Sequence, residues 1–161
     1  MVQADFVTVV CEGLVIPTNA YGLMSDGVAA RVRAVAGAGP EQEAVQSAPI
    51  AVGAAVVTSA GALHGVSKLI HVPVVDAAGM RIGIENVRRA TRASLLAAAR
   101  FRLASIAIPG IGYGENGIPY DETARAILDE VRACKLDNPR KVLLVDNDPQ
   151  MIEAFLLMLD D

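Results

Sequence analysis

The sequence predicts an α/β protein, a three-layer α/β/α sandwich around a mixed central sheet. Strand-like and helix-like segments alternate through the second half of the 161-residue chain, which favours a sheet covered by helices. Two strand-like segments, 105–108 and 141–145, are continuously apolar after their first residue, and this indicates burial on both faces. Apolar residues make up 53% and charged residues 20%, which excludes a disordered or fibrous chain. Because no repeat or linker interrupts the pattern, we expect one domain over 1–161.

The first half contains short β-branched segments bounded by turn-forming residues, and these predict strands. Their ranges are 6–10, 14–18, 55–59 and 68–75. Two helices are expected between the second and third of these strands. The first covers 27–36, and the second runs from Pro40 to about Gln46, because proline favours the first turn of a helix.

The second half is expected to begin with the longest helix, over 84–102, since its apolar residues recur at steps of three and four. These residues are Ile84, Val87, Thr91, Leu95 and Ala98. The elements that follow are a strand at 105–108, a helix at 121–133, a strand at 141–145 and a helix at 149–159. Asp121 is expected to cap the first of these two helices, and Pro149 to open the second.

Charge and composition restrict the function classes. Eighteen acidic and 14 basic residues give a net charge of −4, so a broad basic face for duplex nucleic acid is not expected. No apolar run is long enough to span a membrane and no secretory signal pattern is present, which favours a soluble cytoplasmic protein. Cys11 and Cys134 match no metal-ligand spacing, so we expect reduced, mostly buried thiols. His71 is expected in the core, His64 in a surface turn, and no metal is expected.

A glycine-rich segment lies between the strand at 105–108 and the helix that follows it. Within residues 110–119, Gly112, Gly114 and Gly117 form the pattern G-x-G-x-x-G. Glycine lets backbone N–H groups converge on one point, and a helix N-terminus next to them favours phosphate. The alternatives are a plain strand-to-helix loop and a dinucleotide-binding fold, but the latter places its motif after the first strand.

A second loop begins at Asn19, where a strand is expected to end, and leads to Gly27 and Val28 at the start of a helix. Two such loops at one edge of a sheet would form a cleft suited to a diphosphate. The Asn19 amide offers donors and an acceptor to sugar hydroxyls, but it could equally only close the turn. The residues alone leave both roles open.

Taken in order, these segments resemble the macro domain, an ADP-ribose-binding α/β/α module. The shared order is an acid, a strand ending in I-P-T-N at Asn19, a loop ending at Gly27, and a helix ending in A-V-A-G. The segments G-A-A-V-V-T, K-L-I-H and E-N-V-R-R-A-T follow, and then the glycine loop from Pro109 to Pro119. The resemblance covers about residues 5–159 and implies the same fold, with no cofactor.

The resemblance also implies roles at the two ends of the ligand. Glu12, with Gly13 beside it, stands where an aspartate of the family accepts a hydrogen bond from the adenine amine. Asn147, after the last strand, would lie near the same base. Asn19 would hold the distal ribose, and it is linked to catalysis in hydrolytic members of the family.

For the middle of the ligand, the resemblance implies that the two loops hold the diphosphate. Gly27 and Val28 would lie near the diphosphate and the distal ribose. The second loop would cradle the phosphates with its backbone at Gly112, Tyr113, Gly114, Glu115 and Asn116. Asn116 replaces an aromatic residue that the family often places against the ribose, and Met24, Ser25 and Asp26 replace glycines of its first loop.

The resemblance therefore implies an ADP-ribose-binding protein, whose partner is ADP-ribose or an ADP-ribosylated macromolecule. One alternative is an enzyme that uses the same cleft, an ADP-ribosyl hydrolase or an O-acetyl-ADP-ribose deacetylase, with Asn19 and Asp26 as candidate catalytic residues. Another is a regulatory or structural module that has lost the ligand. The sequence leaves the oligomeric state open.

Overall fold

The computed structural model describes residues 2–3, 5, 7–25, 27–75, 83–113 and 117–160. In this part of the chain, a six-stranded sheet has the order β1-β6-β5-β2-β4-β3. The strands are β1 (Val2–Gln3), β2 (Cys11–Asn19), β3 (Val56–Ser59), β4 (Val66–Val75), β5 (Ser105–Pro109) and β6 (Lys141–Val145). Neighbouring strands pair in parallel except β3, which is antiparallel to β4. The mixed sheet is therefore confirmed, and its parallel strands end at one common edge.

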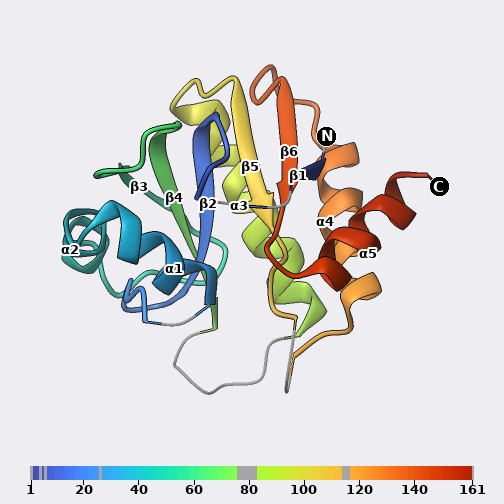
Figure 1. Ribbon diagram of the computed structural model, residues 1–161, viewed down its shortest axis with the longest axis horizontal. Coiled ribbons are helices and arrows are strands. Elements are labelled where there is room, and N and C mark those ends of the chain that lie inside the picture. The colour runs from blue at the N-terminus through green and yellow to red at the C-terminus, as the bar shows by residue number, and fades with distance from the viewer. Residues whose placement is uncertain are drawn as a thin grey trace.

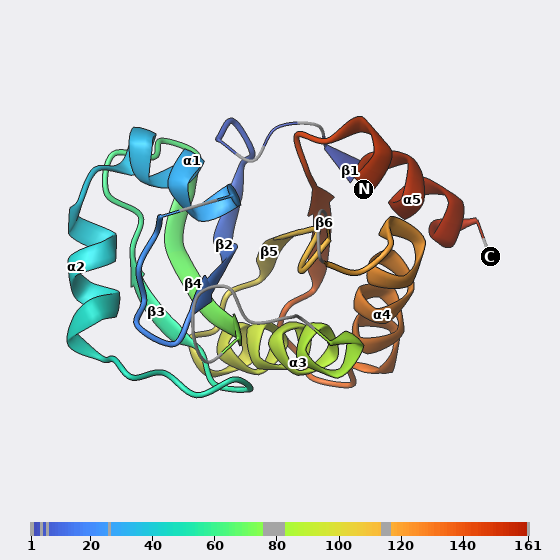
Figure 2. The ribbon, with the colours of Figure 1, turned by 90° about the horizontal axis from the view of Figure 1, so that it is seen from below.

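Helices cover both faces of this sheet. They are α1 (Gly27–Ala36), α2 (Gly39–Gln46), α3 (Ile84–Arg100), α4 (Tyr120–Ala133) and α5 (Pro149–Leu159). Figure 2 shows α1 on one face, with α2 beside it near β3, and α3 and α4 on the other. Helix α5 packs against α4 near β1, and the strands β2, β4, β5 and β6 run toward the lower side of Figure 1. The α/β/α sandwich is confirmed.

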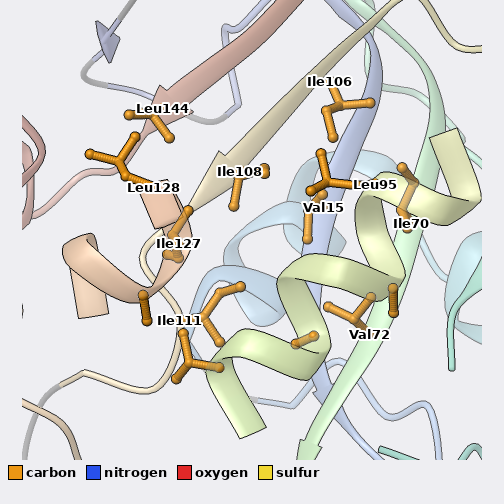
Figure 3. Packing of buried hydrophobic residues seen from close by; sticks show 14 of the residues in the cluster. Val15, Ile70, Val72, Leu95, Ile106, Ile108, Ile111, Ile127, Leu128 and Leu144 are labelled. Atoms are coloured by element: carbon orange, nitrogen blue, oxygen red, sulfur yellow. The ribbon is translucent and has the colours of Figure 1, made fainter. Parts of the chain in front are cut away.

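The core consists of two layers because alternate residues of the strands face opposite sides. Val15, Ile70 and Ile106 point toward α3 and α4, as Figure 3 shows, and are fully buried. Leu14 and Leu69 point the other way, into the layer under α1. Burial on both faces explains the apolar runs at 14–16 in β2 and at 106–108 in β5.

Two predictions about local structure are wrong. No strand is formed at 7–10; residues 7–8 form a turn instead. The Val7 N–H donates to Asp5 Oδ1 at 3.0 Å, and the Thr8 hydroxyl donates to the Asp5 carbonyl at 3.4 Å, so Asp5 closes this turn. Asp121 does not cap α4, because the helix begins at Tyr120 after Pro119 and Asp121 lies in its first turn.

The other expected elements are present, with bounds that differ by no more than a few residues. His71 is fully buried, as expected, with its Nε2 atom 2.8 Å from Thr58 Oγ1. Burial lowers the pKa of His71 to about 4, so the ring is neutral at pH 7. Cys11 is buried and Cys134 half-buried, and neither forms a disulfide. Among the described residues, no helix is long and apolar enough to cross a membrane.

Candidate ligand-binding site

The site is built where the parallel strands end. Strands β2 and β5 are neighbours, so the loops that follow them lie at the same edge. We call residues 20–26 the first loop and residues 110–119 the second loop; Asp26 and residues 114–116 lie outside the described part of the chain. Strand β1 ends beside the end of β6, since Gln3 pairs with Val145. Both loops therefore share the carboxyl edge, on the lower side of Figure 1, and strands β1 and β6 end beside each other at the same end of the sheet.

Asn19 lies at the end of β2 and closes the start of the first loop. Its Oδ1 atom accepts a hydrogen bond from the Tyr21 N–H at 2.9 Å, and its carbonyl accepts one from the Gly22 N–H at 3.2 Å. The turn uses the Oδ1 atom of this half-buried side chain. The Nδ2 amide group is the part of the side chain that a sugar hydroxyl could use.

The first loop is held by α2. Glu41 Oε2 accepts a hydrogen bond from the Met24 N–H at 2.6 Å, and Glu41 Oε1 lies 2.8 Å from Arg33 Nε on α1. Partial burial acts to raise the pKa of Glu41, but these two bonds outweigh it and lower the pKa. The Met24 side chain is 1% exposed and packs in the core, so this replacement of glycine does not obstruct the cleft.

Helix α1 presents its N-terminus at this edge. Gly27, its first residue, has a φ of +59°, and a Cβ there would meet no atom within 4 Å, so the space beside it is open. None of its first-turn residues, all of which are described, is acidic. The first N–H groups of a helix lack partners within it, and the helix dipole favours an anion there. Val28, next to Gly27, is half-buried against the core under α1.

The described part of the second loop closes tightly on itself. Gly112 has a φ of +76°, which favours glycine, and its carbonyl accepts a hydrogen bond from the Ile118 N–H at 2.8 Å. A Cβ at Gly117 would collide with that same carbonyl. The loop therefore needs glycine at both positions. The predicted phosphate-binding residues Gly114, Glu115 and Asn116 lie outside the described residues.

A buried carboxylate fixes the second loop to the end of β6. Asp146 is 1% exposed, and its Oδ1 atom accepts a hydrogen bond from the Tyr113 hydroxyl at 2.6 Å. Its Oδ2 atom accepts from the Gly110 N–H at 3.0 Å. Burial raises the pKa of Asp146, although these bonds act against it, and burial together with Asp146 raises the pKa of Tyr113. The predicted binding residue Tyr113 thus uses its side chain within the protein.

A second tyrosine and a second aspartate extend this arrangement. The Tyr120 hydroxyl donates to Asp148 Oδ2 at 2.8 Å, and Asp148 caps α5 by accepting from the Gln150 N–H. The rings of Tyr113 and Tyr120 are 5.1 Å apart. Long-range contacts of this kind were not predictable from a local pattern.

The structure does not bring Glu12 and Gly13 to the other predicted residues. Both lie at the amino end of β2, about 20 Å from Asn19 for an extended strand of this length. Glu12 Oε2 accepts hydrogen bonds from the N–H groups of Ala104 and Ser105, and the Glu12 N–H donates to Ser105 Oγ at 3.0 Å. These residues join β2 to the start of β5, so the geometry does not support the expected adenine contact.

A further acid near the carboxyl edge is Asp5, which is not among the site residues predicted from the sequence. It lies two positions after the end of β1, at the same edge as Asn147, which is exposed after β6. Asp5 is half-buried, and its Oδ1 atom is used by the Val7 N–H. The sequence signal for Asp5 is an acid that precedes a short apolar segment bounded by turn-forming residues. A strand at 6–10 would place Asp5 away from the site, whereas the turn at residues 7–8 leaves it close to the end of β1.

Comparisons with known proteins identify the family. The family model for the macro domain matches residues 15–127. A protein of Aquifex aeolicus is 40% identical over 155 residues, 96% of this chain and 93% of the relative. A protein of Aeropyrum pernix is 34% identical and covers 89% of this chain, and the match takes in 75% of that relative.

Solved structures show the same fold. A variant of the Oceanobacillus iheyensis macrodomain with ADPR superposes with a TM-score of 0.85 at 20% identity, covering 99% of this chain and 90% of that chain. The Trypanosoma brucei macrodomain in complex with ADP-ribose superposes with a TM-score of 0.84 at 20% identity, covering 98% of this chain and 68% of that chain. The sequence match, the fold and the two loops at one sheet edge agree, and the chain belongs to the macro domain family.

Proposed function

We propose that this protein binds ADP-ribose, free or attached to a macromolecule, between the first and second loops. The observation that carries the proposal is the pair of positive-φ glycines, Gly27 and Gly112, at neighbouring points of one sheet edge. Each lies in a connection between a strand and a helix, where backbone N–H groups can converge on an anion. Two such anion sites side by side suit the two phosphates of a diphosphate.

The diphosphate would be held by the backbone rather than by cationic side chains. The described residues of the two loops include no lysine, arginine or histidine. The first turn of α1 lacks acidic residues, and its N–H groups lie at the carboxyl edge directly after the first loop. A helix N-terminus contributes about 0.3–1 kcal/mol to an anion, and up to about 2 kcal/mol when partly buried. An acidic protein can therefore bind an anionic ligand at this edge.

The two ends of the ligand would be recognised by side chains on either side of the loops. Asn19 would donate from Nδ2 to the distal ribose, because its Oδ1 atom closes the turn to Tyr21. The acid for the adenine amine would be Asp5 rather than Glu12. Asp5 lies at the carboxyl edge, and a carboxylate that accepts from Val7 has further lone pairs for a second donor. Asn147, which follows the neighbouring strand β6, would contact the same base.

Macrodomains with ADP-ribose that share this fold support binding as the function. Hydrolysis needs a group that activates water, and no carboxylate, histidine or cysteine occurs among the described residues of the two loops. The candidate Asp26 lies outside that part of the chain. We therefore propose a binding protein and leave hydrolysis to the second arm of the test.

Calorimetric titration with ADP-ribose tests the proposal. The wild-type protein should release heat that saturates at one ligand per chain, and Asn19→Ala should weaken binding about tenfold by removing one hydrogen bond to the ligand. No heat at millimolar ADP-ribose would overturn the proposal. In the second arm, the wild-type protein is incubated with a mono-ADP-ribosylated protein. Release of ADP-ribose that Asn19→Ala abolishes would establish the hydrolase instead of the reader.

A further inference from the structure

Tyr113 stands in the middle of the second loop but its side chain faces the protein. Its hydroxyl donates to Asp146 Oδ1 at 2.6 Å, although 33 positions separate the two residues. The residues on both sides of it in the sequence are glycines, which impose no direction of their own on the loop. The bond to Asp146 therefore supplies a long-range constraint at this point of the loop.

Asp146 ties together both the start and the middle of the second loop. Besides Tyr113, it accepts from the Gly110 N–H at 3.0 Å and from the Asp148 N–H at 2.9 Å. Gly110 is the first residue of the loop, so one carboxylate holds two points of it against the end of β6. Because Asp146 is 1% exposed, each of these bonds is shielded from competition with water.

Packing leaves the Tyr113 ring little alternative space. A Cβ at Gly110 would lie 2.5 Å from Tyr113 Cε1 and 2.6 Å from the Met151 side chain, so the ring lies directly on the Gly110 backbone. The Tyr120 ring is on another side, at 5.1 Å between centroids. The ring, and not only the hydroxyl, is therefore held in place.

The same bonds decide which backbone donors are left for a ligand. The Gly110 N–H is directed to Asp146, and the Ile118 N–H is directed to the Gly112 carbonyl. Both ends of the loop thus use their donors within the protein. Among the described residues of the loop, a phosphate would therefore meet the backbone between these two points, at residues 111–113, next to the Tyr113 anchor.

We infer that Tyr113 is the positioning residue of the second loop: by its hydroxyl bond to Asp146 it holds the backbone of residues 110–113 in the arrangement that receives the diphosphate. The inference rests on the proposed ADP-ribose binding. Tyr113 touches no ligand through its side chain and acts through the loop backbone. The expected consequence is an affinity that depends on one hydroxyl directed away from the ligand.

The test compares two single-atom changes, Tyr113→Phe and Tyr120→Phe. Both remove a tyrosine hydroxyl that donates to an aspartate, and both keep the ring. Only the first bond reaches Asp146, which holds the second loop. The dissociation constant for ADP-ribose is measured by calorimetry, at a temperature at which a thermal unfolding curve of each variant has first verified that it is folded. We expect Tyr113→Phe to weaken binding about tenfold and Tyr120→Phe by less than twofold.

The outcomes separate the inference from the proposed function. A merely structural role for Tyr113 would lower its unfolding midpoint but leave the affinity of the folded protein equal to that of Tyr120→Phe, and this would overturn the inference alone. If the wild-type protein does not bind ADP-ribose, the proposed function falls and the inference falls with it. Asp146→Asn provides a second variant that weakens the same bond from the other side. It should weaken binding at least as much as Tyr113→Phe, and unchanged affinity would contradict the inference.

Discussion

The two edges of the sheet place similar residues in different surroundings. At the amino edge, the Glu12 carboxylate accepts hydrogen bonds from two backbone N–H groups of the segment that enters β5. These bonds join the start of β2 to the start of β5. At the carboxyl edge, Asp5 and Asn19 use one oxygen each for a local turn, and the start of α1 lies open beside Gly27. Side chains satisfied by the protein stabilise the fold, whereas donors left open can bind a ligand. Under the proposed function, the edge at which an acid lies decides whether it joins strands or meets the ligand.

The strongest way to test this contrast uses the two ends of α1. Gly27 and Gly37 both have a positive φ and open space where a Cβ would be placed, and they are about 15 Å apart along the helix. Gly27→Glu should weaken ADP-ribose binding at least 100-fold, because its carboxylate would repel the diphosphate. Gly37→Glu has a similar backbone strain but should change the affinity by less than twofold. Calorimetry measures both, and equal losses would remove α1 from the site.

At the amino edge the expected effect is on stability. Glu12→Ala removes the acceptor of two N–H groups in a half-buried position, which costs about 2 kcal/mol of unfolding free energy. The affinity of the folded protein for ADP-ribose should stay within twofold of the wild type. Urea unfolding and calorimetry on the same samples provide the two readings. A large loss of affinity without a loss of stability would show that Glu12 contacts the ligand.

A matched pair of amide substitutions compares the acids of the two edges directly. Asp5→Asn should weaken ADP-ribose binding about tenfold, since it loses the charge that strengthens an accepted hydrogen bond to the adenine amine. Glu12→Gln should leave binding unchanged, because a neutral amide oxygen can still accept from the Ala104 or Ser105 N–H. Comparing the two dissociation constants decides between the acids. A larger loss of affinity in Glu12→Gln than in Asp5→Asn would show that the acid that contacts adenine lies at the amino edge.

The smallest expected effect concerns His71, which lies in β4 away from both edges. Its pKa is about 4 in the folded protein and 6.5 ordinarily, so the unfolded chain binds the proton more tightly. The part of the unfolding free energy that depends on a neutral His71 is fully present above pH 6.5 and is lost as the pH falls toward 4. Between pH 7 and pH 5.5 the loss amounts to about 1 kcal/mol. Urea unfolding at the two pH values measures it. His71→Gln should remove this part of the pH dependence, and an identical slope in both proteins would refute it.

Much of the fold was predictable because local signals agree with it. The continuous apolar runs of β5 and β6 reflect burial on both faces, and Pro149 opens α5 as expected. Strand β1 was not predictable, because its two residues carry no periodicity and its partner is distant in the sequence. The prediction of a strand at 6–10 was wrong because Asp5 closes a turn at residues 7–8, and this turn has no signal in the local pattern of apolar residues.

The candidate site was predictable to the extent that it depends on glycine. The loops around Gly27 and Gly112 were placed correctly at one edge, because glycine patterns and strand ends are local features. The position of Glu12 depends on where β2 begins, and the strand extends back to Cys11 rather than Leu14. The bond between Tyr113 and Asp146 joins distant segments, and no spacing in the sequence encodes it.

One measurement tests the central claim directly, that ADP-ribose binds at the carboxyl edge of the sheet. In a ¹H–¹⁵N correlation spectrum of the labelled protein, titration with ADP-ribose should shift the amide signals of Asn19, Gly27 and Gly112 in a saturable way. The signals of Glu12 and Ala104, at the amino edge, should stay in place. Saturable shifts confined to Glu12 and Ala104, or no shifts at millimolar ligand, would contradict the account.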